Sequence, residues 1–220
     1  MSELLHTTRI LQIQQVTHDV KRFVCVRPTQ FEFREGQAVE VSIANKGWED
    51  KSRPFTLTSV PTDGVMEFVI KIYKSHDGVT RQLDKLNVGA DLLISNPFGA
   101  IEYKGSGIFI AGGAGVTPFI SILRSYHHDE NRVIFSNKTP QDVILGAELE
   151  LLSNGKLTNV FTEKAPTGDN CQRIDKSYLS ESIDNFDQQF YVCGPPVFTK
   201  DINSHLEELG ANAASISLEK

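Results

Sequence analysis

Short apolar runs and amphipathic stretches alternate along the second half of the chain. The run over residues 108–111 contains only apolar residues, which is typical of a strand buried on both faces of a parallel sheet. Strands are expected over residues 108–111, 132–135, 157–161, 189–193 and 214–218, and helices over residues 117–127, 141–152, 176–183 and 197–209. This alternation predicts an α/β domain, with a parallel sheet and helices on both of its faces.

Residues 1–100 follow a different pattern, with short segments rich in β-branched residues that are separated by turn-forming ones. Strands are expected over residues 11–16, 20–27, 38–43, 54–60, 66–73 and 91–96, and one helix over residues 79–86. Several short antiparallel strands in succession predict a small β-barrel. The chain is therefore expected to form two domains, a barrel over residues 1–103 and an α/β domain over residues 104–220.

Composition and charge narrow the choice of partners. The chain has 220 residues, of which 40% are hydrophobic and 23% are charged, with a net charge of −6. The negative charge argues against a nucleic acid or an anionic membrane as the main partner, although a local basic patch could still meet a small acidic protein. Because it has no signal-peptide pattern and no apolar run of about 18 residues, the chain is expected to be cytoplasmic and not inserted in a membrane.

The cysteine and histidine positions do not predict a metal site. Cys25, Cys171 and Cys193 are far apart and lack the paired spacing of zinc, iron–sulfur or disulfide sites. His127 and His128 follow a predicted helix in a polar segment, without a further ligand nearby. A solvated helix end is the better interpretation of that segment.

A glycine-rich turn follows the strand over residues 108–111, with the spacing Gly113-x-Gly115-x-x-Pro118. Thr117 is expected to cap the helix that comes next, and Pro118 to occupy its first turn. Free N–H groups and the positive end of the helix dipole would then face the turn, which would suit a phosphate. The spacing differs from the usual GxGxxG fingerprint, and on its own it is equally compatible with glycines that only allow close packing.

A second informative segment covers residues 53–59. Alternation along a strand would place Arg53, Phe55 and Ser59 on one face, with Pro54 and Thr56 on the other. On its own, this segment is compatible with a solvated arginine at the edge of a strand and a phenylalanine in the core.

These two segments occur in a fixed order with others, which are Phe33-x-x-Gly36-Gln37 and residues 78–83, 96–99 and 191–196. Any one of them could arise by chance, but the whole ordered set hardly could. Over residues 6–219 the chain thereby resembles the ferredoxin-NADP reductase superfamily. The resemblance implies an FAD-binding Greek-key barrel that precedes an α/β domain for a pyridine nucleotide.

The resemblance also implies roles for residues of the barrel. Arg53 would hold the FAD pyrophosphate, and Phe55 would lie against the isoalloxazine ring. The hydroxyl of Thr56 would reach flavin N5, the atom that accepts the hydride. The other residues expected to contact FAD are Gly78, Val79 and Thr80 at its pyrophosphate, and Pro54, Ser59, Val69, Lys71 and Tyr73 along the rest of the molecule.

In the second domain, the resemblance assigns to the NAD(P) pyrophosphate the residues Gly113, Gly115, Val116 and Thr117. It assigns to the nicotinamide the residues Cys193, Gly194 and Pro195. Thr56, Cys193 and Glu219 would be the groups beside the reacting atoms. Cys193 is also compatible with the role of a small buried hydrophobic residue, and it could fill both roles.

The choice between NADH and NADPH is expected to depend on the end of the second strand of the α/β domain, where acidic residues favour NADH and basic residues favour a 2′-phosphate. No carboxylate occurs between Phe135 and Asp142, whereas Ser136 and Lys138 could contact a phosphate. The sequence thus slightly favours NADPH as the substrate, with NADH tolerated. However, Lys138 is nearly as compatible with the role of a solvated charge in a loop as with a contact to the 2′-phosphate.

The predicted function is that of a flavoenzyme that transfers a hydride from NAD(P)H to bound FAD and then passes electrons to an acceptor. The acceptor would be separate, namely flavodoxin, ferredoxin, another redox protein or a partner enzyme, because the chain lacks iron–sulfur ligand spacing. Two alternatives remain open. One is a flavin reductase that uses free flavin as a substrate, and the other is a non-catalytic electron-transfer or binding subunit with this fold.

Overall fold

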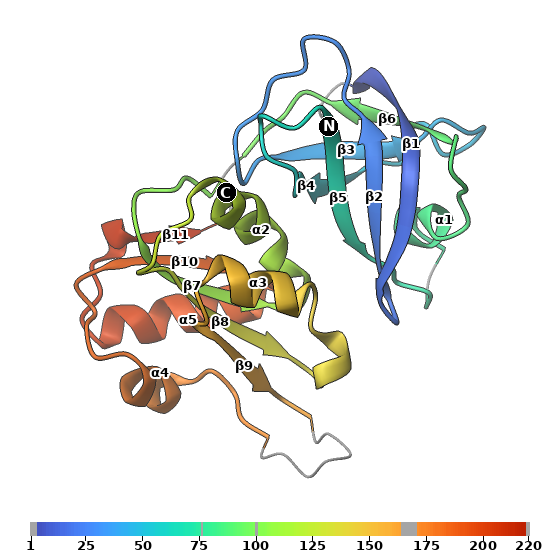
Figure 1. Cartoon of the computed structure of the whole chain (residues 1–220). Coiled ribbons are helices and arrows are strands. Elements are labelled where there is room, and N and C mark those ends of the chain that lie inside the picture. The colour runs from blue at the N-terminus through green and yellow to red at the C-terminus, as the bar shows by residue number, and fades with distance from the viewer. Residues whose placement is uncertain (1–3, 76, 100, 164–170, 219–220) are drawn as a thin grey trace.

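The computed structural model describes residues 4–75, 77–99, 101–163 and 171–218. They form two domains that each contain one β-sheet and that meet along one side (Figure 1). The N-terminal sheet is antiparallel with six strands, and the C-terminal sheet is parallel with five strands. The predicted fold class is therefore confirmed.

The N-terminal strands are β1 (Leu4–Thr17), β2 (Val20–Val26), β3 (Ala38–Ile43), β4 (Arg53–Thr56), β5 (Val65–Lys71) and β6 (Asp91–Ser95). Their order in the sheet is β4-β3-β6-β1-β2-β5. The two edge strands meet just beyond β4, where Leu57 bridges Phe68 of β5 and the Thr58 N–H donates to the Glu67 carbonyl oxygen (2.9 Å). These contacts close the sheet into a barrel.

The interior of the barrel is filled by apolar side chains from the strands and from the helix. Phe23 and Phe68, on β2 and β5, are fully buried. Helix α1 (Val79–Leu83) adds Val79 and Leu83 to the same core. The short helix is thus held to the barrel by its apolar side.

The C-terminal domain contains strands β7 (Gly107–Gly112), β8 (Arg132–Asn137), β9 (Leu157–Phe161), β10 (Gln189–Cys193) and β11 (Ile216–Leu218), helices α2 (Thr117–Ser125), α3 (Gly146–Leu152), α4 (Lys176–Ser182) and α5 (Pro196–Glu208), and 3₁₀-helices over Gly113–Val116, Pro140–Asp142 and Ala213–Ser215. The strand order is β11-β10-β7-β8-β9. The chain therefore adds β8 and β9 on one side of β7, and β10 and β11 on the other. Ligands in open α/β sheets bind at such a reversal of strand order, outside the carboxyl ends of the strands.

Alternation along β7 divides its side chains between two apolar layers. Ile108 and Ile110 belong to the layer that also contains residues of α4 and α5. Phe109 and Ala111 belong to the layer on the opposite face, with residues of α2 and α3. Figure 1 shows the two pairs of helices on opposite sides of the sheet, as the run of apolar residues in β7 predicts.

Helix α2 connects the two domains. The apolar cluster that contains its Ile122 also contains Val20 and Val69 of the barrel. In addition, the buried hydroxyl of Ser121 accepts a hydrogen bond from the Gly36 N–H of the barrel (3.0 Å). The barrel thus packs on the face of the sheet that α2 covers.

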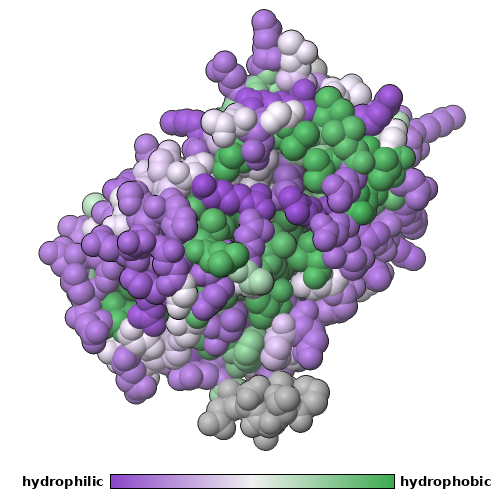
Figure 2. All heavy atoms as spheres, in the orientation of Figure 1, coloured by the Kyte–Doolittle hydropathy of each residue, from purple (hydrophilic) through white to green (hydrophobic). Residues whose placement is uncertain are grey.

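The surface is mixed in character. Figure 2 shows hydrophilic residues over most of the visible face, with hydrophobic residues gathered on the barrel at the upper right and in the middle, where the domains meet. Among the described residues, no helix is long and apolar enough to cross a membrane.

Several predicted boundaries differ from the structure. Strand β1 extends well beyond residues 11–16, and β4 ends at Thr56 instead of residue 60. The helix predicted over residues 141–152 is wrong in its first half, where a 3₁₀-helix ends at Asp142 and α3 begins only at Gly146. The helix is interrupted because Val143 is extended and the φ of Leu145, 50°, lies in the left-handed region, so neither residue continues a right-handed helix.

We expect Gly107→Ala to destabilise the C-terminal domain, because a Cβ at this position would lie 2.2 Å from the Gln189 carbonyl oxygen of β10. Overpacking of this kind typically costs about 1–3 kcal/mol, which should lower the midpoint of urea unfolding. Gly64→Ala is the control, because nothing lies within 4 Å of a Cβ there. Equal midpoints for the two variants would show that β7 and β10 adjust without cost.

Candidate functional site

A cleft of about 650 Å³ lies between the two domains. One wall comes from β4 and β5 of the barrel, and the other from the carboxyl ends of β7, β8 and β10. The cleft therefore lies where the strand order of the parallel sheet reverses. Of the residues predicted to bind cofactors, those that line it are Pro54, Phe55, Thr56, Val69, Lys71, Tyr73, Thr80, Gly113, Gly115, Thr117, Ser136, Lys138, Cys193, Gly194 and Pro195.

The barrel wall combines an aromatic face with a positive charge. Phe55 of β4 lines the cleft while it packs against the barrel core. The next residue, Thr56, is only 8% exposed and pairs with Ala38 of β3. Lys71, at the end of β5, places its Nζ 3.0 Å from a carboxylate oxygen of Asp19. This wall is thus held by the sheet on one side and by an ion pair on the other.

The glycine-rich turn of the opposite wall has two different requirements for glycine. Gly113 has a φ of 53°, and a Cβ there would meet nothing within 4 Å, so its backbone is open to the cleft. At Gly115, a Cβ would lie 2.4 Å from the Cys193 carbonyl oxygen. Gly115 therefore lets the turn lie directly on the loop that follows β10.

The prediction that Thr117 caps α2 is wrong. Residues Gly113–Val116 form a 3₁₀-helix, and α2 begins at Thr117, whose hydroxyl donates to the Ala114 carbonyl oxygen (3.0 Å). The tighter 3₁₀-helix occupies the place that the sequence suggested for a simple turn. Pro118 does lie in the first turn of α2, as predicted. The glycine segment and Thr117 still line the cleft.

Phe198 of α5 lies against the end of β7 and the loop that follows β10. A Cβ on Gly112 would lie 3.1 Å from the Phe198 ring, and a Cβ on Gly194 would lie 2.7 Å from it. The ring thus fills the space that side chains at these glycines would need. Cys193, at the end of β10, is 2% exposed beside them.

Some of the predicted residues do not line the cleft; they are Arg53, Ser59, Gly78, Val79 and Val116. Arg53 is exposed, and its guanidinium donates to the Ser52 carbonyl oxygen (2.7 Å). Ser59 is 1% exposed, and its hydroxyl accepts from the Glu67 N–H (3.1 Å). The two valines are buried in the apolar cores.

Glu219 lies outside the described residues. Conversely, the cleft contains residues that the sequence did not single out, namely Asn137, Asp142, Thr162 and Phe198. Asn137 and Thr162 end or directly follow β8 and β9. Their position just after predicted parallel strands is the signal that could have found them.

Lys138 has an acidic partner that its neighbours in sequence do not reveal. Its Nζ lies 3.1 Å from a carboxylate oxygen of Glu163, and both side chains are more than half exposed. The Glu163 N–H also donates to the Lys138 carbonyl oxygen (2.9 Å). A negative charge therefore stands beside the lysine at the end of β8.

Comparison with known proteins supports the two-domain interpretation. Residues 7–103 match the oxidoreductase FAD-binding domain family, and residues 109–204 match the oxidoreductase NAD-binding domain family. The chain belongs to the ferredoxin-NADP reductase superfamily. A ferredoxin NADP⁺ reductase of Neisseria gonorrhoeae, solved with bound FAD and NADP, shares the fold, with a TM-score of 0.83 over 97% of each chain and 22% identity.

Sequence relatives in this superfamily are reductases. The reductase component of propane 2-monooxygenase from Rhodococcus jostii is 26% identical over 93% of this chain. NADH-cytochrome b5 reductase 2 of Mycosarcoma maydis is 28% identical over 84% of it. The chain spans 60% of the length of each of these two relatives.

The residues of the cleft fit the FAD and the pyridine nucleotide that the superfamily binds. The backbone at Gly113 is open, and it precedes the start of a helix, where N–H groups can meet a phosphate. Phe55 offers an aromatic face for a ring system. Asn137 also lines the cleft, and its buried side-chain amide nitrogen has no hydrogen-bond partner among the described residues.

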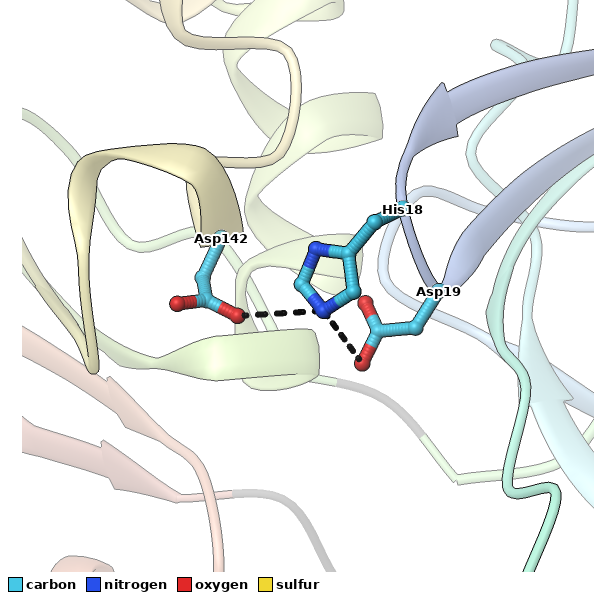
Figure 3. A group of neighbouring side chains, drawn as sticks. All are labelled: His18, Asp19 and Asp142. Carbon is cyan, nitrogen blue, oxygen red and sulfur yellow. Dashed lines mark ion pairs between the residues drawn. The ribbon is translucent and has the colours of Figure 1, made fainter.

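His18, Asp19 and Asp142 meet at the edge of the cleft, the first two from the turn after β1 and the third from the C-terminal domain (Figure 3). The His18 Nε2 lies 3.7 Å from Asp19 and 3.8 Å from Asp142. Lys71 already pairs with Asp19, and the Thr139 N–H and hydroxyl donate to Asp142 (2.9 and 2.6 Å). These contacts account for the cluster, so we assign no metal to it.

Glu67 carries a buried charge behind the barrel wall and is only 4% exposed. Burial alone would raise the pKa of this carboxyl group. However, the charge of Arg124, hydrogen bonds from Arg124 and Thr58, and the charge of Arg22 lower the pKa more, so it lies below its ordinary value. Glu67 therefore stabilises the fold most when it is ionised.

We expect Glu67→Gln to lower the free energy of unfolding by about 2–3 kcal/mol at neutral pH, because two partly buried arginines lose their charged partner. The contribution is present above the unfolded pKa of about 4.3 and is lost as the pH falls through the lower folded pKa. Urea unfolding from pH 7 to pH 3 should thus show the gap between wild type and variant closing.

The control for this experiment is Glu208→Gln, which breaks an exposed pair with Lys176. It should have little effect on unfolding at any pH. A gap between wild type and Glu67→Gln that is the same at every pH would contradict the assignment of the acid dependence to Glu67.

Proposed function

We propose that the chain is a reductase that uses NAD(P)H to reduce FAD held in the cleft and then delivers electrons to a separate acceptor. One observation carries this proposal. The predicted flavin wall, with Phe55 and Thr56, and the predicted nucleotide wall, with Gly113, Gly115 and Cys193, line the same cleft. When bound there, FAD would supply the redox chemistry by accepting the hydride and releasing electrons.

The residues of the chain would bind and align the reactants. Phe55 would lie against the flavin ring, and the Thr56 hydroxyl would donate to it from the end of β4. The Gly113–Gly115 backbone would hold the nucleotide pyrophosphate at the start of α2. Cys193, almost fully buried at the opposite wall, would limit how the nicotinamide can lie. No acid–base group is required for such a transfer.

We propose a protein as the acceptor, either a small redox protein or an oxygenase component. The support is that curated relatives are named as reductase components or subunits of oxygenase systems, including the glycine betaine monooxygenase reductase subunit of Chromohalobacter salexigens, which is 27% identical over 93% of this chain. Use of free flavin as a substrate remains the alternative. It is favoured by Arg53, which is exposed and does not line the cleft.

For the nucleotide, we propose that the Lys138–Glu163 pair controls the choice between NADPH and NADH. Lys138 would attract a 2′-phosphate, whereas Glu163 would repel it and could accept from a ribose hydroxyl. The exposed pair is worth little in itself, so a ligand could separate it at low cost. Glu163 thereby weakens the slight preference for NADPH that the sequence indicates.

The purified protein should be yellow, and heating should release FAD and not FMN. Anaerobic addition of NADPH or NADH should then bleach the visible absorbance of the oxidised flavin. A colourless protein that oxidises NAD(P)H only with added flavin would support the free-flavin alternative. A protein that neither binds flavin nor oxidises either nucleotide would contradict both.

We expect Lys138→Ala to lower kcat/KM for NADPH by about 10- to 150-fold, the equivalent of a charge-assisted hydrogen bond of about 1.5–3 kcal/mol, and to leave NADH nearly unchanged. Glu163→Gln should shift the preference in the opposite direction, towards NADPH, because it removes the repulsion. Lys156→Ala, at the far end of β9, is the control. Equal effects of Lys138→Ala on both nucleotides would remove the pair from the site.

A further inference from the structure

Arg124 binds both domains at once from the last turn of α2. Its Nη1 donates to the Thr58 carbonyl oxygen (2.7 Å) and to the Glu67 carboxylate (2.9 Å), and both acceptors belong to the barrel. Its Nε donates to the Glu148 carboxylate of α3 (2.7 Å). The Arg124 side chain is 17% exposed. One largely buried guanidinium therefore ties two elements of the C-terminal domain to the barrel.

The acceptor on the barrel is itself fixed in place. The second carboxylate oxygen of Glu67 accepts from the Nε of Arg22 on β2 (2.6 Å), and the first also accepts from the Thr58 hydroxyl (2.8 Å). The Glu67 N–H donates to Ser59 (3.1 Å). Arg124 thus meets a rigid partner and not a side chain that could follow it.

The residues on the two sides of this contact are close in sequence to the two walls of the cleft. Helix α2 starts at Thr117, at the end of the glycine turn, and Arg124 lies seven residues further on, about 10 Å along the helix axis. On the barrel side, Thr58 lies two residues after Thr56, which lines the cleft. A tilt of α2 at Arg124 would therefore shift the nucleotide wall relative to the flavin wall.

We propose that Arg124 is a positioning residue that sets the spacing between the two walls of the cleft, and hence the alignment of nicotinamide and flavin. This inference rests on the proposed function. The apolar contacts of Val20, Val69 and Ile122 hold the domains together, but such contacts have no preferred direction and allow small shifts. A planar guanidinium bound to three acceptors has a fixed geometry.

Stability alone does not account for this arrangement. A buried ion pair adds little to folding in comparison with apolar side chains of similar volume, because desolvation offsets most of the attraction. Its particular contribution is to define one relative position of its partners. In a hydride transfer, a misplacement of about 1 Å can slow the reaction roughly 100-fold.

The kinetic test compares Arg124→Met with the control Arg132→Met. Arg132 lies at the end of β8 far from the cleft and donates to the Ser182 carbonyl oxygen, so the control loses a hydrogen bond within the C-terminal domain. In stopped-flow experiments on the FAD-loaded protein, Arg124→Met should lower the limiting rate of flavin reduction at least 10-fold, with less than about a threefold change in the nucleotide dissociation constant. The control should keep the wild-type rate. The reduction rate of Arg124→Lys should lie between those of the wild type and Arg124→Met, because an ammonium group keeps the charge but cannot reproduce the hydrogen-bond geometry of the guanidinium.

A structural test needs no activity. Nitroxide labels on Lys46→Cys in the barrel and Lys200→Cys on α5, both exposed positions, can report the distance between the domains in a Cys171→Ser background. The distance distribution should broaden or shift in Arg124→Met and stay unchanged in Arg132→Met. The labelled protein carries FAD, so that both experiments describe the same state.

Each outcome bears on the proposal. A wild-type reduction rate together with an unchanged distance distribution in Arg124→Met would overturn it. If that variant does not fold, Arg124→Lys decides by the same two measurements. If neither nucleotide reduces the flavin of the wild-type protein, the proposed function fails, and the distance distributions alone decide whether Arg124 sets the domain arrangement.

Discussion

The contact between the glycine turn and the loop after β10 is the constraint on which the cleft depends. A Cβ on Gly115 would lie 2.4 Å from the Cys193 carbonyl oxygen and 2.5 Å from the Gly194 nitrogen, so only glycine permits the two backbones to touch. At the other end of the same strand pair, Gly107 meets Gln189 in a similar way. Glycine at both ends lets β7 and β10 run side by side and end together at the cleft.

The cleft is formed by two domains with different interiors, and α2 is the element that both share. Its apolar residues belong to the layer that covers the sheet, and that layer extends to Val20 and Val69 of the barrel. Its polar residues, Ser121 and Arg124, bind defined atoms of the barrel. Apolar burial supplies the attraction between the domains, whereas the directional bonds select one arrangement from the many that burial would allow.

Charges around the cleft act in two ways because their exposure to water differs. Water weakens the exposed Lys138–Glu163 pair, which would leave both side chains available to the nucleotide that we propose. The pair between Arg124 and Glu67 is largely shielded from water, so separating the two charges would leave an unpaired charge in a medium of low polarity. The first pair suits recognition of a ligand, and the second suits a fixed framework.

The sequence by itself determined the two-domain architecture, because hydrophobic periodicity and glycine turns reflect local backbone geometry. It also located Phe55, Thr56, Gly113 and Cys193, which do line the cleft, through ordered motifs that resemble a known family. It did not determine the 3₁₀-helix before α2 or the break at Leu145, since both depend on how the segment packs against the sheet.

Only the tertiary structure decided which polar side chains face each other. Arg53 and Ser59 carry the expected chemistry but do not line the cleft, while Asp142, Thr162 and Phe198 do line it. Lys138 and Glu163 are separated along the chain by a 3₁₀-helix, α3 and β9. Glu67 and Arg124 are separated by α1, β6, β7 and a second 3₁₀-helix. Such pairs form because strands and helices are placed side by side by burial of their apolar faces, and no local pattern in a sequence records that placement.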